Sequence, residues 1–279
     1  MTVREALAEA TLYIPRRDAE LLLAHTAERS RAWLLAYPEA ALDPDILAGF
    51  NTLVRRRDAG EPVQHLTGQQ EFFGLALQVS PAVLIPRPET EHLVEEVLGW
   101  ARAHPSPTLR MADVGTGSGA IALALAANLP DADIVAVDLS TRALAVARGN
   151  ADRLHLSHRV RFLESDLLSA VTSGARMGGN FDVVASNPPY VAETDAPTLA
   201  PEVRDHEPAL ALYGGTDGLA VYRRLIPQAR TALRSGGLLA LEIGFGQRIA
   251  LEELLQGWSE VRFVEDYAGI PRVGLAVRA

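Results

Sequence analysis

The stretch Met111–Ala126, MADVGTGSGAIALALA, is the most informative about the fold of this chain of 279 residues. It begins with an apolar run typical of a buried strand and ends with a run typical of a helix. The glycines between them, Gly115, Gly117 and Gly119, let a ligand approach the backbone closely. The helix that follows starts with free N–H groups that attract anions. The stretch therefore predicts the first strand, turn and helix of a ligand-binding α/β sheet.

Strand-like and helix-like runs alternate from this stretch to the end of the chain. The further strand-like runs are DIVAVD, VRFLES, FDVVASN, GLLALEIG, VRFVED and RVGLAVRA, and the helix-like runs cover 120–128, 141–154, 219–233 and 247–255. This order predicts an α/β fold with a mostly parallel, Rossmann-like sheet covered on both faces. Only YAGIP separates the last two strand-like runs, so one edge strand is expected to be antiparallel. Residues 172–180 are expected to form a loop.

The part of the chain before this sheet has a different character. Residues 1–60 are predicted to form a small helical domain, because apolar side chains recur at helical spacing between prolines. Residues 61–85 alternate aromatic, β-branched and polar residues around Gly74, which predicts a connecting β-hairpin. Residues 86–279 are expected to form the sheet domain, which opens with PRPET and an amphipathic helix.

The composition excludes several kinds of chemistry. The chain has no cysteine, and all 26 of its basic residues are arginine. A thiol nucleophile, a cysteine-based zinc site, a lysine Schiff base and a P-loop are therefore impossible. We also expect no metal site. The formal charge of −9 argues against direct binding of nucleic acid, which usually requires a basic face.

Nothing in the chain predicts a targeting or membrane segment. Its beginning, MTVREALAEATLYIPRRDAE, mixes acids and bases, unlike a signal peptide. The longest apolar stretches, such as 120–127, are much shorter than the roughly 20 residues that a membrane helix needs. We therefore expect a cytoplasmic protein that contacts no membrane.

The residues of the glycine-rich turn that we expect to bind a cofactor are Gly115, Thr116, Gly117, Ser118 and Gly119. Asp138 ends the next strand about twenty residues on, where an acid accepts hydrogen bonds from both ribose hydroxyls. The turn and Asp138 together indicate an adenosine-containing cofactor. They do not distinguish NAD from S-adenosylmethionine. The alternative is a tight turn that binds no ligand.

Asp166 and Leu167 follow the third strand of the predicted sheet. The Asp166 carboxylate is placed to accept a hydrogen bond from the adenine amino group, and Leu167 is placed to lie against the ring. An equally open alternative is that Asp166 caps the turn that follows it.

The most specific feature is FDVVASNPPY, in which a strand leads into Asn187, Pro188, Pro189 and Tyr190. Open α/β sheets bind ligands at the carboxyl ends of their strands, so these residues face the predicted cofactor. The prolines fix the backbone, and the Asn187 side-chain oxygen and Pro188 carbonyl then present two acceptors at a fixed separation. Two acceptors orient an NH₂ group for attack on an electrophile, while Tyr190 packs against a planar amide. The turn predicts methylation of an amino nitrogen, with Asn187, Pro188 and Tyr190 as catalytic residues; the alternative is a rigid loop.

With the glycine-rich turn, Asp138 and NPPY in this order, the chain resembles class I S-adenosylmethionine-dependent methyltransferases that act on amino nitrogens. Four further segments are similar to the HemK/PrmC-type release-factor glutamine methyltransferases, namely EPVQHLTGQQEFFGL, LIPRPETEHLVEEV, EPALALYGGTDGLAVYRRL and DYAGIPRV. The resemblance covers nearly the whole chain. It implies S-adenosylmethionine as cofactor, S-adenosylhomocysteine as product, and methylation of the side-chain amide nitrogen (N5) of the GGQ-loop glutamine in peptide chain release factors.

The resemblance also implies roles for individual residues. The turn at 115–119 and Asp138 would bind the cofactor. The turn at 187–190 would bind the substrate glutamine, with Asn187 also near the cofactor. The chain departs from the family at Leu167, where tryptophan is frequent, so a weaker adenine contact is expected there.

Two further implications concern the surroundings of the site. Arg87, Glu89 and Thr90 of PRPET would line its lip. The helical domain at 1–60 would supply a docking surface for the release factor.

Three other functions stay open on the sequence. A DNA adenine-N6 methyltransferase would also hold an NH₂ group, but would be expected to carry a basic recognition region. An NAD-linked oxidoreductase would share the glycine-rich turn and leave NPPY without a role. A non-enzymatic adaptor would bind the release factor and leave its methylation unchanged.

Several polar residues are expected to be structural, namely His155, His158, Asp205, His206, Glu207, Glu242 and Asp266. The two histidines at 155 and 158 have no third ligand at a suitable distance for a metal. The group at 205–207 introduces EPALAL, a segment beside the site. Glu242 and Asp266 end predicted strands.

Overall fold

The structure is a computed structural model that describes residues 1–172 and 180–279. It contains two compact units, one formed by residues 1–69 with 200–206 and the other by residues 70–199 with 207–279. Most of the loop expected at 172–180 lies outside the described residues. The domain boundaries expected after residues 60 and 85 stay a prediction.

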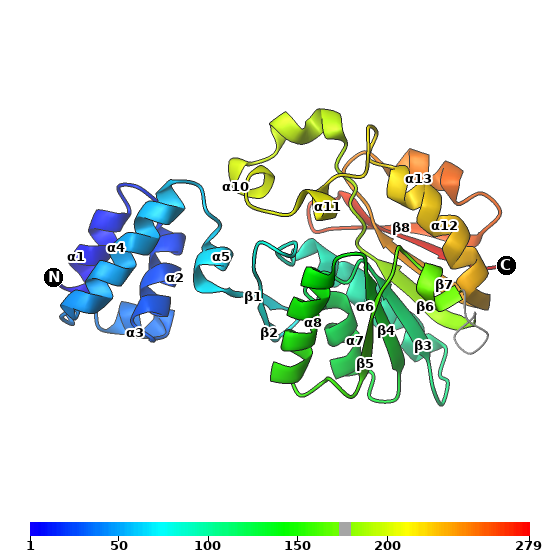
Figure 1. The fold of residues 1–279 in the computed structure, drawn as a ribbon, viewed down its shortest axis with the longest axis horizontal. Coiled ribbons are helices and arrows are strands. Elements are labelled where there is room, and N and C mark those ends of the chain that lie inside the picture. Colours follow the sequence, from blue (N-terminus) through cyan, green and yellow to red (C-terminus); the bar gives the residue numbers. More distant parts are fainter. Residues whose placement is uncertain (173–179) are drawn as a thin grey trace. The chain divides into compact units, whose positions relative to one another are not determined.

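The first unit consists of short helices (Figure 1). They are α1 (Val3–Ala10), α2 (Arg16–Thr26), α3 (Arg31–Ala36), α4 (Pro44–Asp58), α5 (Val63–Thr67) and α10 (Pro201–Arg204). The first five contribute to an apolar core that contains the buried side chains of Leu22 and Phe50. Arg57 lies 2.7 Å from Asp18 and 2.6 Å from Glu202, so ion pairs join α4 to α2 and α10.

A short hairpin follows, β1 (Gln69–Phe72) and β2 (Leu75–Gln78), which forms a two-stranded sheet of its own. Phe73 and Gly74 make its turn with φ values of 50° and 76°, the left-handed pair that a two-residue hairpin turn requires. The range expected to be hairpin, 61–85, begins instead with α5. The helix forms there because Pro62 precedes it and Gly68 ends it in a left-handed conformation.

The second unit is built on a seven-stranded sheet (Figure 1). Its strands are β3 (Arg110–Val114), β4 (Asp133–Asp138), β5 (Val160–Glu164), β6 (Phe181–Ser186), β7 (Leu233–Glu242), β8 (Ser259–Glu265) and β9 (Pro271–Val277). Their order is β5-β4-β3-β6-β7-β9-β8, and the strands from β5 to β7 run parallel. β9 pairs antiparallel with both β7 and β8, so the reversed strand lies one place in from the edge. The predicted α/β fold is confirmed.

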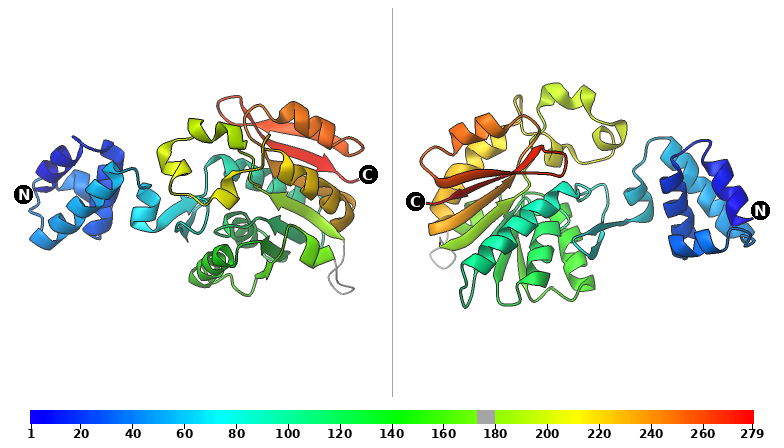
Figure 2. Two further views of the ribbon diagram at one scale, coloured as in Figure 1. Left: turned by 45° about the horizontal axis from the view of Figure 1, so that its top comes forward. Right: turned by 180° about the vertical axis from the view of Figure 1, so that it is seen from behind.

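Helices cover both faces of this sheet (Figure 2). α6 (Glu89–Ala103), α7 (Ala120–Asn128) and α8 (Thr141–Arg153) pack on one face, and α9 (Ser169–Thr172), α12 (Ala220–Ala232) and α13 (Arg248–Leu254) on the other. The short helices η1 (Glu193–Thr198) and α11 (Ala209–Leu212) lie in the connection from β6 to α12. Strands covered on both faces explain the continuous apolar runs in the sequence. Within the described ranges, no helix combines the length and apolarity needed to cross a membrane.

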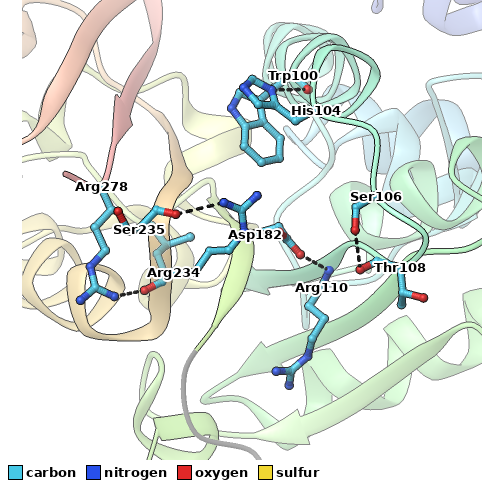
Figure 3. A network of polar contacts seen from close by, with 10 residues as sticks. Trp100, His104, Ser106, Thr108, Arg110, Asp182, Arg234, Ser235 and Arg278 are labelled. Atoms are coloured by element: carbon cyan, nitrogen blue, oxygen red, sulfur yellow. Dashed lines mark hydrogen bonds and ion pairs between the residues drawn. The ribbon is translucent and has the colours of Figure 1, made fainter.

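Asp182 joins three central strands at their amino ends (Figure 3). Its carboxylate accepts hydrogen bonds from the backbone N–H of Arg110 at 2.7 Å and from Nε of Arg234 at 2.6 Å, which links β3, β6 and β7. The Arg234 guanidinium lies 6.0 Å from the centroid of the Trp100 ring, which stacks on His104. These contacts fix the amino ends of the strands, opposite the ends that carry the predicted site.

Candidate active site

A pocket opens at the carboxyl ends of β3, β4 and β6, the position where open α/β sheets bind their ligands. Among the predicted site residues, those that line it are Gly115, Thr116, Gly117, Ser118, Asp138, Asp166, Leu167, Asn187 and Pro189. Gly119, Pro188 and Tyr190 belong to the same two turns. The sheet topology thus brings predicted residues from the ends of four strands, β3, β4, β5 and β6, to one place.

The glycine-rich turn has a backbone that glycine adopts far more easily than other residues. Gly115, Gly117 and Gly119 have φ values of 73°, 56° and 86°. A Cβ on Gly117 would meet nothing within 4 Å, so its backbone faces open space. A Cβ on Gly115 would lie 4.0 Å from the carbonyl oxygen of Asn187, so the glycine-rich and NPPY turns are neighbours.

The buried carboxylate of Asp113 supports this turn, a role that sequence reasoning missed. It accepts hydrogen bonds from the Thr116 hydroxyl at 2.6 Å and from the N–H of Ala122 at 3.1 Å, which ties the turn to α7. Burial raises the pKa of Asp113 to about 7. The sequence signal that could have found this role is the position of Asp113 inside the apolar run MADV, where an acid is expected to be buried and hydrogen-bonded.

Asp138 stands at the end of β4 with both carboxylate oxygens facing backbone donors. Oδ2 accepts a hydrogen bond from the N–H of Gly117 at 2.9 Å, and Oδ1 from that of Ser140 at 2.8 Å. Burial raises the pKa of Asp138. The carboxylate therefore shapes the glycine-rich turn as well as lining the pocket.

Asp166 and Leu167 line the pocket in different ways. The Asp166 carboxylate is half exposed and pairs with Arg224 at 2.6 Å. Leu167 has a φ of 53° and packs against the apolar core on the α12 side of the sheet. Leu139 and Leu210 add apolar surface to the same pocket.

The NPPY turn is joined to two other elements through hydrogen bonds. The Asn187 side-chain Nδ2 donates to the Thr90 hydroxyl in α6 at 3.1 Å, and that hydroxyl donates to Oε2 of Glu242 at 2.5 Å. The Tyr190 hydroxyl donates to the other oxygen, Oε1, at 3.2 Å. Glu242 is only 2 % exposed, and burial raises its pKa to about 7. Thr90, Asn187, Tyr190 and Glu242 thus form one connected network.

Two glycines, Gly214 and Gly218, pack closely against the backbone of the NPPY turn. A Cβ on Gly214 would lie 2.6 Å from the carbonyl oxygen of Pro189, and one on Gly218 only 2.3 Å from that of Tyr190. Gln247 donates a hydrogen bond to the same Tyr190 carbonyl at 3.0 Å. These close approaches explain Gly214 and Gly218 of YGGTDG and fix the position of the turn.

At the predicted lip of the site, Glu207 is buried and holds the PRPET segment. Its carboxylate accepts hydrogen bonds from the N–H of Ile85 at 3.0 Å and from the Arg87 guanidinium. Glu89 and Thr90 begin α6. Glu207 therefore has the structural contacts expected of it.

Two other acids that end strands differ in their placement. Asp266 pairs with Arg272 at 2.9 Å and accepts hydrogen bonds from the backbone of the β8–β9 turn, as a structural residue would. Glu242 lies instead in the network around Asn187, which the sequence-based expectation did not include. An acid closing the apolar run LLALE, at the same sheet edge as NPPY, is the signal that could have found it.

Two family models match the chain. One, described as PrmC N-terminal domain, matches residues 2–68, and the other, described as methyltransferase small domain, matches residues 100–203. Solved structures similar in fold include the N-terminal domain of human METTL16 in complex with SAH, at 19% identity and a TM-score of 0.54 over 92% of this chain and 94% of that one. A methyltransferase from Pyrococcus furiosus has 20% identity and a TM-score of 0.53 over 74% and 90%.

Similar proteins of known name extend over nearly the full chain. The chain is 45% identical to the release factor glutamine methyltransferase of Moorella thermoacetica, over 100% of this chain and 99% of that one. It is 43% identical to the proteins of the same name from Koribacter versatilis (98% and 97%) and Escherichia coli (98% and 96%). The resemblance found in the sequence is thus confirmed, and the chain belongs to the release factor glutamine methyltransferase family.

Proposed function

We propose that this chain transfers a methyl group from S-adenosylmethionine to the side-chain amide nitrogen of the GGQ-loop glutamine in peptide chain release factors. The observation that carries the proposal is the orientation of the Asn187 side chain. Its Nδ2 is committed to Thr90, which leaves Oδ1 as the acceptor for a substrate NH₂ group beside the pocket.

The residues around the pocket fit S-adenosylmethionine. Gly117 leaves room for close approach to the backbone, and the Asp138 carboxylate provides acceptors for ribose hydroxyls. Leu139, Leu167 and Leu210 offer apolar surface suited to the adenine ring. When bound, the cofactor supplies a methyl group on a positively charged sulfur, and S-adenosylhomocysteine is its product. Asp166 is assigned a smaller part in adenine binding because its carboxylate is half exposed and paired with Arg224.

The chain's own residues orient the substrate amide. Asn187 Oδ1 and the Pro188 carbonyl each accept a hydrogen bond from one N–H of the glutamine amide, so that its nitrogen faces the cofactor side of the pocket. Both acceptors also stabilise the positive charge that develops on this nitrogen as the N–CH₃ bond forms and the S–CH₃ bond of the donor breaks. One N–H proton then leaves to solvent, which gives the neutral N-methylamide. Pro189 fixes the backbone of the turn, and Tyr190 packs against the planar amide with its hydroxyl anchored on Glu242.

The partner follows from the family. We propose that the helical domain at 1–60 docks the release factor and that the protein works in the cytoplasm, where release factors act. Among the alternatives open on the sequence, family membership favours a glutamine amide over the adenine amino group, hydride transfer or a non-enzymatic adaptor.

The proposal is tested by incubating the protein with radiolabelled S-adenosylmethionine and a purified release factor. Label should enter the wild-type release factor and be lost when the GGQ glutamine is replaced by alanine. Label that persists in that substrate variant contradicts the proposed acceptor. Binding titrations with NADH and with S-adenosylmethionine distinguish this function from the oxidoreductase alternative. An oxidoreductase would bind NADH tightly.

A further inference from the structure

The Glu242 carboxylate connects two elements of the candidate site that are far apart in sequence. It lies at the end of β7, is 2 % exposed, and accepts one hydrogen bond on each oxygen. Thr90 of α6 donates to Oε2 at 2.5 Å, and Tyr190 of the NPPY turn donates to Oε1 at 3.2 Å. A buried carboxylate is costly unless hydrogen bonds compensate it, so this placement calls for a reason.

The direction of the hydrogen bonds determines the orientation of the Asn187 amide. A threonine hydroxyl has one proton, and Thr90 gives it to Glu242. The Thr90 oxygen therefore meets Asn187 with lone pairs only and accepts from Nδ2 at 3.1 Å. A flipped Asn187 amide would lose this hydrogen bond and place two oxygens against each other. The carboxylate, acting through Thr90, thus favours the orientation that leaves Oδ1 for the substrate.

We propose that Glu242 is a positioning residue for methyl transfer, which fixes the Asn187 amide through Thr90 and holds the Tyr190 ring through its hydroxyl. This inference rests on the proposed function. Glu242 does not touch the substrate; it acts by setting the direction of the hydrogen bonds that end at Asn187 and Tyr190.

The other groups around Glu242 agree with this role. The Tyr222 hydroxyl in α12 donates to the Glu242 backbone carbonyl at 2.7 Å, which fixes the main chain at the end of β7. Arg272 of β9 is close enough to lower the pKa of Glu242, and Glu89 of α6 raises it, while burial is the dominant effect. Neither replaces Thr90 or Tyr190 as a hydrogen-bond partner of the carboxylate.

The test compares methyl transfer to a release factor by the wild type, Thr90→Val, Thr90→Ser and Glu242→Gln. Thr90→Val keeps the shape of the side chain and removes the hydroxyl, so kcat should fall on the order of 10²-fold. Thr90→Ser keeps the hydroxyl and should keep kcat within about threefold of wild type.

Glu242→Gln cannot accept hydrogen bonds from both Thr90 and Tyr190 and should lower kcat on the order of 10-fold. The Kd for S-adenosylmethionine should change by less than about threefold in all three, because the amide of Asn187 is oriented toward the substrate.

The double variant Thr90→Val/Glu242→Gln tests whether Glu242 acts through Thr90. Its kcat should lie within about threefold of Thr90→Val alone. The route through Thr90 is already lost, and the one amide oxygen of the glutamine can still accept the hydrogen bond of the Tyr190 hydroxyl. Losses that simply multiply overturn the inference. If the wild type methylates the release factor, an unchanged kcat in Thr90→Val and in Glu242→Gln overturns the inference as well. If the wild type itself transfers no methyl group, the proposed function fails instead.

Asp182 provides a matched control for a merely structural role. It is also a buried carboxylate that accepts two hydrogen bonds, but it lies at the opposite end of the strands. Asp182→Asn should lower the free energy of unfolding and leave kcat within about twofold of wild type, since it does not contact the site. A loss of kcat in Asp182→Asn equal to that in Glu242→Gln contradicts a positioning role.

Discussion

The Thr90 hydroxyl donates a 2.5 Å hydrogen bond to Glu242 across 152 positions of sequence. This contact joins the first turn of α6 to the end of β7, and both residues reach the NPPY turn, Thr90 through Asn187 and Glu242 through Tyr190. The turn that carries the proposed chemistry is therefore held by side chains from two other elements as well as by its own prolines.

Replacing Asn187 with alanine should abolish methyl transfer. The variant loses one of the two acceptors for the substrate amide, so the nitrogen is no longer oriented for attack. Cofactor affinity should stay within about threefold of wild type, because the glycine-rich turn and Asp138 are untouched. Single-turnover methyl transfer and calorimetric titration with S-adenosylmethionine measure the two effects. Turnover equal to that of the wild type would refute the role assigned to Asn187.

Gly218→Ala should destabilise the protein strongly. Its Cβ would lie 2.3 Å from the Tyr190 carbonyl oxygen at a φ of 74°, so the NPPY turn must move. Gly246→Ala is the matched control, because Gly246 has a φ of 79° and nothing within 4 Å of its Cβ. We expect a loss of about 1–2 kcal/mol for Gly246→Ala and more than about 3 kcal/mol for Gly218→Ala in urea unfolding. Equal losses in the two variants would argue that the close approach to Tyr190 is unimportant.

Asp138→Ala should weaken the binding of S-adenosylmethionine. The variant removes the proposed ribose acceptor and the hydrogen bond that holds the N–H of Gly117. An increase in Kd of about 10–100-fold follows from the loss of hydrogen bonds to a charged acceptor. Asp166→Ala is the comparison, with an expected change below about threefold because that carboxylate is exposed and paired with Arg224. A larger effect at Asp166 would reverse the assignment of the two acids.

The stability advantage of Glu242→Gln over the wild type should grow as the pH rises. Burial raises the pKa of Glu242 from its ordinary 4.5 to about 7, so the folded protein holds this proton more tightly than the unfolded chain. The resulting stabilisation is fully present below pH 4.5, falls as the pH rises toward 7, and is gone above it. Glutamine does not titrate, so urea unfolding at pH 5 and pH 8 should show the difference between the proteins growing by on the order of 2 kcal/mol. A difference that is the same at both pH values would mean that Glu242 does not titrate in this window.

The sequence predicts most of this fold because the information is local. The apolar runs of β3, β4, β6 and β7 are buried on both faces and therefore continuous, and the short YAGIP connection requires a reversed strand. The helical turn at α5 escaped prediction, since Pro62 and Gly68 define its ends more strongly than the alternating pattern around them defines a strand.

The candidate site is predictable in part for the same reason. The glycine-rich turn and NPPY are each contiguous in sequence, and their backbone conformation is set by the residues of the motif itself. The partners of these motifs depend on strand register and helix position. No local sequence pattern predicts that Thr90 hydrogen-bonds to Glu242 or that Gly218 packs against the Tyr190 carbonyl oxygen. Such contacts arise only when β6, β7 and α6 are packed together.

Mass spectrometry of the GGQ peptide shows whether this chain methylates the GGQ-loop glutamine. A release factor produced without methylation is treated with S-adenosylmethionine and either the wild-type protein or Asn187→Ala, then digested and sequenced by fragmentation. We expect one added methyl group on the glutamine side chain with the wild type and none with the variant. An unmodified glutamine after treatment with the wild-type protein, or a methyl group on another residue of the peptide, would contradict it.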